Sequence, residues 1–196
     1  NYTYTLVPIT NVDEITFANT TPTPLSSSDT NRSFQHKHRP NLGWKMSIKI
    51  GDQVDNFTVH SNKGIINLKD YKGKFVVLYF YPKDNTPGCT VEANDFKQLY
   101  PKFKQKNAEI LGISRDSLTS HDKFACKYEL PFPLLADSDS KICDLFGVIN
   151  NKFLFGKTAL GLVRSTFLID LTGKLIKEWR KVKVTNHAQE VLDSIP

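Results

Sequence analysis

Residues 75–92 have the sequence FVVLYFYPKDNTPGCTVE, and the expected fold follows most directly from this segment. The run Phe75–Tyr81 is a continuous series of β-branched, aromatic and leucine side chains, which predicts a central strand covered on both faces. Pro82 ends that strand. Apolar side chains then recur at helical spacing from about Cys89 to Lys104. We therefore expect a buried strand, a short loop and a helix in direct succession, with Cys89 in the first turn of the helix.

The chain on either side of this stretch alternates between strand and helix patterns. Helices are expected at residues 120–129, where Ser120 is the candidate cap, at 137–146 and at 186–194. Further strands are expected at residues 56–60, 64–67, 109–114, 165–170 and 174–179. The last two form a hairpin around residues 171–173. Strands that alternate with helices predict a layered α/β domain.

The composition changes near Trp44. Residues 1–45 are rich in Thr, Ser, Asn and Pro and have too little apolar surface to offset the entropy of ordering. The sole methionine, Met46, stands where the globular pattern begins. We expect residues 1–45 to be a disordered extension or a leader, and residues 46–196 to form the functional domain. The start lacks the features of a signal peptide, so the predicted location is the cytoplasm, or an organelle if residues 1–45 are a leader.

Composition also narrows the function classes. The formal charge is +6, but the basic residues are scattered, so nucleic-acid binding is not expected. No run approaches the length of a membrane span. The histidines His60, His121 and His187 have no metal-ligand spacing and are expected to be surface or capping groups. No phosphate-binding loop is present, so neither a metal nor a cofactor is predicted.

The chain has three cysteines, Cys89, Cys126 and Cys143, and this odd, sparse count argues against a secreted disulfide scaffold. The predicted position of Cys89 is chemically informative, because unpaired N–H groups at a helix start stabilise a thiolate. Thr86 can aim a hydroxyl at the sulfur or at a peroxide. Arg164 precedes a predicted strand and can reach the loop of a neighbouring strand, where a guanidinium would stabilise the thiolate. Together these residues indicate a site for a small electrophile.

Pro82, Thr86 and Cys89 also match the Pro-x-x-x-Thr-x-x-Cys signature of peroxiredoxins. The wider run resembles the peroxiredoxin Q subfamily, also called bacterioferritin comigratory protein, and the likeness covers roughly residues 46–196. The resemblance implies a thioredoxin-like fold, with a central mixed β-sheet flanked by helices. It also implies an antioxidant, thiol-dependent peroxidase that reduces hydrogen peroxide and organic hydroperoxides. Cys89 would be the peroxidatic residue, with Pro82, Thr86 and Arg164 in the active site. Glu92 matches a recurrent family position, either as helix support or in the chemistry.

The chain departs from the subfamily in how the oxidised cysteine is resolved. Many relatives have a resolving cysteine five residues after the peroxidatic one, where this chain has Asn94. Cys126 lies in the next predicted helix, where other relatives place a resolving cysteine, and either it or an external thiol would complete the reaction. Thioredoxin, glutaredoxin or glutathione would then act as reductant, on an enzyme that is often monomeric in this subfamily. Cys143 is expected to be a small buried filler.

Two rival functions are disfavoured by the same residues. A thioredoxin-type disulfide oxidoreductase would need Cys-x-x-Cys, but Thr86 stands in the first position. In a non-catalytic interaction module the chemical positions would be free to vary, yet all of them are intact.

Overall fold

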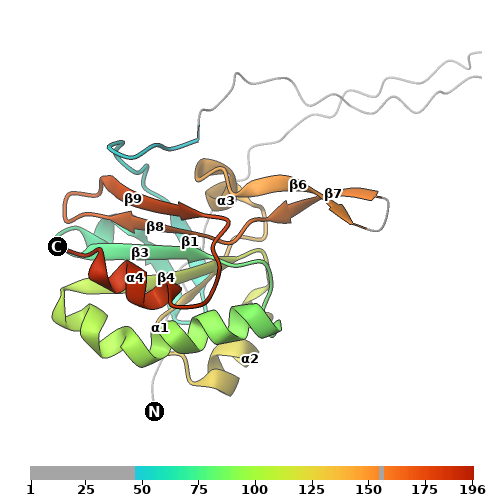
Figure 1. Ribbon diagram of the computed structural model, residues 1–196, viewed down its shortest axis with the longest axis horizontal. Helices are drawn as coiled ribbons and strands as arrows, with labels where there is room; N and C mark the ends of the chain where they lie inside the picture. The colour runs from blue at the N-terminus through green and yellow to red at the C-terminus, as the bar shows by residue number, and fades with distance from the viewer. Residues whose placement is uncertain (1–46, 155–156) are drawn as a thin grey trace, which may run out of the picture. The chain divides into compact units, whose positions relative to one another are not determined.

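The computed structural model describes residues 47–154 and 157–196 (Figure 1). The predicted extension, residues 1–45, lies outside the described residues. The strands are β1 (Thr58–Ser61), β2 (Gly64–Asn67), β3 (Phe75–Phe80), β4 (Ala108–Ser114), β5 (Leu134–Ala136), β6 (Ile149–Leu154), β7 (Lys157–Leu162), β8 (Ser165–Ile169) and β9 (Leu175–Arg180). The helices are η1 (Leu68–Tyr71, a 3-10 helix), α1 (Pro87–Gln105), α2 (Leu118–Tyr128), α3 (Lys141–Leu145) and α4 (His187–Asp193).

Seven strands form one mixed sheet in the order β2-β1-β5-β4-β3-β8-β9. The central strands β3, β4 and β5 run parallel, whereas β8 pairs antiparallel with β3. β6 and β7 form a separate two-stranded sheet that projects from the domain in Figure 1. The predicted layered α/β domain with a central mixed sheet is therefore confirmed.

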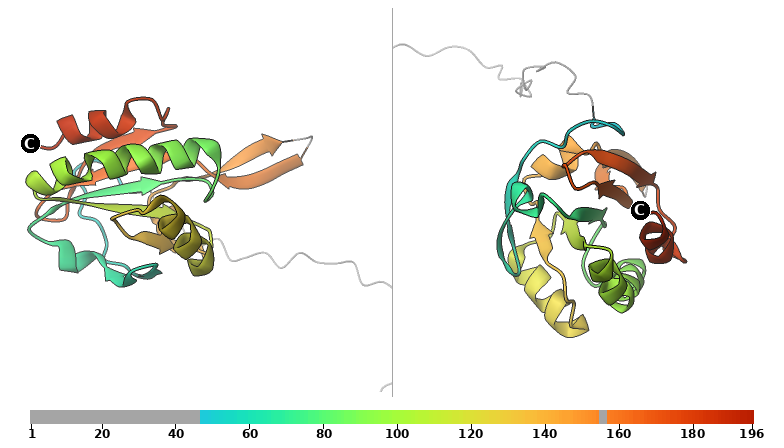
Figure 2. Two further views of the ribbon diagram at one scale, coloured as in Figure 1. Left: turned by 90° about the horizontal axis from the view of Figure 1, so that it is seen from below. Right: turned by 90° about the vertical axis from the view of Figure 1, so that its left-hand side faces the viewer.

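The strand β3 is covered on both faces, as its composition predicts. Val77, Tyr79 and Tyr81 belong to one buried cluster, which side chains of α1, α2 and α4 complete. Val76 and Leu78 belong to a second cluster on the opposite face, together with residues of α3 and the segment that precedes β1. Figure 2 shows α1 and α4 side by side on one face of the sheet. A strand between two apolar layers is a rigid support for the loop that follows it.

Several predicted boundaries need correction. The helix α1 begins at Pro87 rather than Cys89, because proline at the first helical position lacks only an N–H that would be unpaired there anyway. Ser117, not Ser120, caps α2: its side chain accepts a hydrogen bond from the Ser120 N–H. The helix expected at 137–146 is only α3, because the Asp137 carboxylate accepts the N–H groups of Ile142 and Cys143 from outside the helix. The strands β5, β6 and β7 are too short or too mixed in composition to have been predicted.

The register of β8 against β3 brings distant parts of the chain together. Phe80, the last residue of β3, pairs with Ser165, the first residue of β8. Since the two strands are antiparallel, the residue before β8 lies beside the loop that leaves β3. This topology places Arg164 next to the start of α1.

Candidate active site

The first turn of α1 carries Cys89. Thr86 is the N-cap residue, with extended backbone and no side-chain capping bond, and Pro87 and Gly88 lead into the turn. The first-turn N–H groups are therefore not capped by Thr86, and their partial positive charge favours an ionised sulfur. Cys89 is only 1% exposed. The sulfur is thus held in a dry position at a helix start, as the sequence predicts.

The Thr86 hydroxyl is oriented by its own loop. Its Oγ1 donates a hydrogen bond to the Lys83 carbonyl oxygen at 3.0 Å. Because its proton is engaged there, the hydroxyl faces any incoming group as an acceptor. That role suits the O–H of a hydroperoxide better than the sulfur itself. Pro82 is exposed at the start of this loop, where its ring restricts the backbone.

Arg164 meets Cys89 directly. Its Nη2 donates to the Cys89 Sγ at 3.2 Å, and its Nη1 donates to the Glu92 carboxylate. The structure therefore brings together Cys89 and Arg164, which are far apart in sequence. Gly88 also lies beside the guanidinium: a Cβ at this position would be 3.4 Å from Nη2 of Arg164, which is close to van der Waals contact.

The Glu92 carboxyl group is the second partner of this guanidinium. It lies one turn after Cys89 and is 1% exposed. Burial raises the pKa of Glu92 to about 7, although the charge of Arg164 acts in the opposite direction. Its Oε1 has no hydrogen-bond partner among the described residues. Burial would lower the pKa of Arg164, but Glu92 and Cys89 together raise it, so the guanidinium stays charged. The Arg164 guanidinium thus donates hydrogen bonds to both the Cys89 sulfur and the Glu92 carboxyl group.

The loop between β3 and α1 is anchored by a residue that sequence reasoning missed. Asp84 is buried, and its carboxylate accepts hydrogen bonds from Tyr81 Oη and Ser120 Oγ and lies against His121. His121 is fully buried, so its predicted surface or capping role is wrong, and His187 is also buried. No spacing rule relates residues 84 and 121, because only the folded sheet brings them together.

The other two cysteines differ in environment. Cys126 is exposed on α2, whereas Cys143 is buried, as expected for a filler. Burial, together with a hydrogen bond to Asp137, raises the pKa of the Cys143 thiol far above its usual range, which makes it inert.

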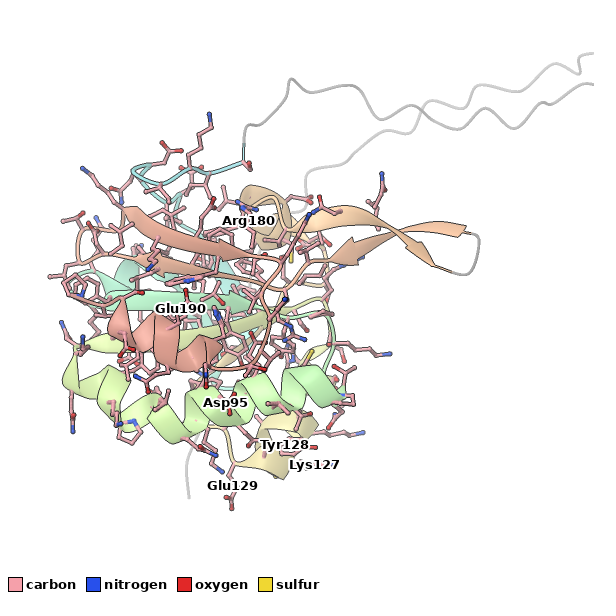
Figure 3. The ribbon with its side chains drawn as sticks, in the orientation of Figure 1. Asp95, Lys127, Tyr128, Glu129, Arg180 and Glu190 are labelled. Atoms are coloured by element: carbon pink, nitrogen blue, oxygen red, sulfur yellow. The ribbon has the colours of Figure 1, made fainter. Side chains whose placement is uncertain are left out.

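The end of α2 contacts α1. The Lys97 ammonium on α1 donates to the Tyr128 carbonyl oxygen at 2.8 Å. A hydrogen bond with Thr90, the neighbour of Cys89, lowers the pKa of Tyr128. Figure 3 shows Lys127 and Tyr128, which follow Cys126, at this end of α2. The helix that carries Cys126 therefore borders the first turns of the helix that carries Cys89.

Within residues 47–154 and 157–196, no group of three or more His, Cys, Asp and Glu side chains is placed to hold a metal ion. None of the helices in these ranges combines the length and apolar character needed to cross a membrane.

Known proteins share both the sequence and the fold. Residues 50–178 match the model of the AhpC/TSA family. Peroxiredoxin Bcp of Bacillus subtilis is 49% identical over 151 residues, which cover 76% of this chain and 96% of that relative. Peroxiredoxin Bcp of Escherichia coli is 40% identical over 147 residues, 74% of this chain and 94% of the relative.

Solved structures agree. A crystal structure of a cysteine-to-serine mutant of Xylella fastidiosa PrxQ has a TM-score of 0.72 and 44% identity, and it covers 76% of this chain and 95% of its own. The bacterioferritin comigratory protein of Xanthomonas campestris has a TM-score of 0.70 and 43% identity, with coverage of 76% and 95%. The predicted thioredoxin-like fold is confirmed. The chain belongs to the AhpC/TSA family, as a peroxiredoxin of the Bcp/PrxQ type, and is a thiol peroxidase.

Proposed function

We propose that Cys89 is the peroxidatic residue and that Pro82, Thr86 and Arg164 complete its active site. The observation that carries this assignment is the 3.2 Å contact between Arg164 Nη2 and Cys89 Sγ in the uncapped first turn of α1. A guanidinium that donates to sulfur in a dry site favours the thiolate, which is the reactive form. Of the three cysteines, only Cys89 has this environment: Cys143 is buried against Asp137 and Cys126 is exposed.

The reaction begins with attack of the Cys89 thiolate on one oxygen of the peroxide. A sulfur–oxygen bond forms and the O–O bond breaks, so the sulfur is oxidised to sulfenic acid and the peroxide is reduced. The departing oxygen leaves as hydroxide or alkoxide and takes up a proton to become water or an alcohol. The Thr86 hydroxyl accepts the O–H of the bound peroxide, and Arg164 stabilises the charge that develops on the leaving oxygen.

Hydrogen peroxide and organic hydroperoxides are the proposed substrates. The Xanthomonas campestris relative is described by its alkyl peroxide reduction activity. The nearly complete burial of Cys89 favours peroxides whose O–O end is slender enough to enter beside Thr86.

Stopped-flow measurement of peroxide consumption tests the assignment. Wild type and Cys126→Ser should consume one equivalent of peroxide per chain at the same second-order rate. Cys89→Ser should consume none. An unchanged rate in Cys89→Ser would refute the role of Cys89.

The sulfenic acid is resolved either by Cys126 or by an external thiol. Cys126 is exposed on a helix that borders the first turns of α1, which supports a disulfide with Cys89 within reach of an external reductant. The internal route requires movement, because Cys89 is buried and Cys126 is exposed. Thioredoxin, glutaredoxin or glutathione would supply the electrons.

Mass spectrometry after one equivalent of peroxide, without added thiol, separates the two routes. Internal resolution predicts a Cys89–Cys126 disulfide. External resolution predicts a sulfenic acid on Cys89 that persists until thiol is added. Cys143→Ser is the matched control and should leave the product unchanged.

We further propose that residues 46–196 are the functional unit and that residues 1–45 are an extension or a leader. We also propose that the enzyme is a monomer. Its proposed location is the cytoplasm, or an organelle if residues 1–45 are a leader that directs it there. The matched region supports the first point, since it spans 96% of the Bacillus subtilis relative but only 76% of this chain. Chain 46–196 should match the full chain in peroxide kinetics and elute as a monomer. Loss of activity on truncation would contradict this division.

A further inference from the structure

The buried carboxylate of Asp84 anchors the loop that leads to Cys89. Asp84 accepts hydrogen bonds from Tyr81 Oη at 2.8 Å and from Ser120 Oγ at 2.7 Å. Its own backbone N–H donates to the Asp116 carboxylate at 2.8 Å. Asp84 lies between Pro82 and Thr86 in sequence, so these contacts fix the middle of the loop whose ends carry the proposed active-site residues.

His121 faces an acceptor at each ring nitrogen. Its Nδ1 lies 2.9 Å from Asp84 Oδ2, and its Nε2 lies 3.1 Å from the Leu135 carbonyl oxygen. A neutral imidazole has one N–H and cannot donate to both acceptors. Tyr81 Oη, 3.4 Å from Nδ1, does not supply the missing proton, because it donates to Asp84 at the shorter distance of 2.8 Å. Both contacts are satisfied only if both ring nitrogens are protonated.

The carboxylate is suited to a charged partner. Burial acts to raise the pKa of Asp84, but hydrogen bonds from His121, Ser120 and Tyr81 lower it overall, so the group is ionised at neutral pH. Asp84 Oδ2 lies 2.9 Å from His121 Nδ1, and both side chains are almost completely removed from solvent. Asp116 is the next acid in the network, and it is occupied by the Asp84 N–H and by Ser114 Oγ. Among the described residues, Asp84 is therefore the carboxylate that faces the His121 ring.

We propose that His121 is a positioning residue: as an imidazolium it holds Asp84, and through Asp84 it keeps the Pro82–Thr86 loop in the arrangement in which Cys89 reacts with peroxide. The ion pair also joins that loop to α2, the helix that carries Cys126. This inference rests on Cys89 as the reacting residue. It adds a buried charge pair, outside the reacting atoms, on which the rate of the first step depends.

The charge on the ring can be tested in the unmodified full-length enzyme. Proton-detected ¹⁵N spectra of the histidine rings at pH 7, with His121 assigned through the backbone, should show both of its nitrogens in the protonated range. A nitrogen of His121 with the shift of an unprotonated imidazole would overturn the proposal. This measurement depends neither on a variant that folds nor on the identity of the reacting cysteine. A failure of the Cys89 assignment would instead appear in the Cys89→Ser kinetics.

His121→Gln tests the positioning role, and His187→Gln is its matched control. His187 is also buried, at 3% exposure, and bonds Thr166 Oγ1 at 2.8 Å, but burial lowers its pKa to about 4, so its loss removes no charge. His121→Gln should lower the second-order rate constant for hydrogen peroxide about tenfold to a hundredfold. Alkylation of Cys89 by iodoacetamide should not slow, because a loosened loop still leaves Arg164 to favour the thiolate.

The control should keep both rates. If His121→Gln lowers the melting temperature but leaves the peroxide rate unchanged at 25 °C, the residue is only structural and the proposal fails. Equal slowing of the peroxide reaction and of alkylation would also overturn the proposal. The substitution would then have changed the general reactivity of the Cys89 sulfur and not the arrangement of the loop.

Asp84→Asn tests the route of the effect. If His121 acts through Asp84, the double variant His121→Gln/Asp84→Asn should be no slower than the slower single variant. Multiplied losses in the double variant would show that the two residues act separately and would contradict the proposal.

Discussion

Glu92→Gln should change the pH dependence of folding stability in a way that can be worked out from the site. Burial raises the pKa of Glu92 from 4.5 to about 7. A carboxyl group with a raised pKa binds its proton more tightly in the folded state. Glu92 therefore does not reduce the free energy of unfolding below pH 4.5, but it reduces this free energy increasingly as the pH rises to about 7. At 1.36 kcal/mol for each unit of pKa, the penalty reaches about 3 kcal/mol above pH 7.

Glutamine keeps the shape but cannot ionise, so the variant should lose this pH dependence. The free energies of unfolding of wild type and Glu92→Gln, measured by urea denaturation at pH 5, 6, 7 and 8, give the comparison. Between pH 5 and pH 8 the difference should shift by about 2.5 kcal/mol in favour of the variant, because part of the penalty is already present at pH 5. A constant difference across this range would refute the reasoning, because it would mean that Arg164 offsets the burial of Glu92 completely and keeps it ionised throughout.

Three further substitutions have defined outcomes. Arg164→Lys should slow peroxide consumption in stopped flow about a hundredfold, because one ammonium cannot reproduce the fork that serves both Cys89 and Glu92; a loss below twofold would contradict this. Tyr79→Phe should leave the free energy of unfolding unchanged or raise it by about 1 kcal/mol, since the buried Tyr79 hydroxyl has no partner among the described residues; a clear loss in urea denaturation would argue against it. Cys143→Ala should lower stability by about 1 kcal/mol through a small cavity and leave peroxide turnover unchanged; slower turnover would give Cys143 a role beyond packing.

Local sequence was enough to predict the helix-start position of Cys89. A buried strand, a proline and a helical pattern are all contained in residues 75–92, and each acts on its neighbours. The burial of β3 on both faces followed from the same run. These features need no information about the rest of the fold.

Other parts of the site depend on contacts between distant segments. The contact of Arg164 with Cys89 follows from the antiparallel register of β8 on β3, which no local pattern specifies. Asp84 and His121 are joined only because the loop after β3 lies beside the start of α2. Read alone, His121 is an isolated histidine in a polar helix start, so the sequence favoured an exposed position, and packing overrode it.

Charge balance shows how a carboxyl group can lie beside a sulfur that, on the proposed mechanism, reacts in its ionised form. In the resting site Arg164 lies between Cys89 and Glu92, and the raised pKa of Glu92 keeps part of its population protonated near neutral pH, so the two anions do not fully compete for one cation. On the proposed mechanism, oxidation turns the Cys89 thiolate into a neutral sulfenic acid. Arg164 would then be a largely buried cation without its first partner, a state that is costly unless another anion is present. Ionised Glu92 fills that role in place, so the guanidinium need not move between the reduced and oxidised states.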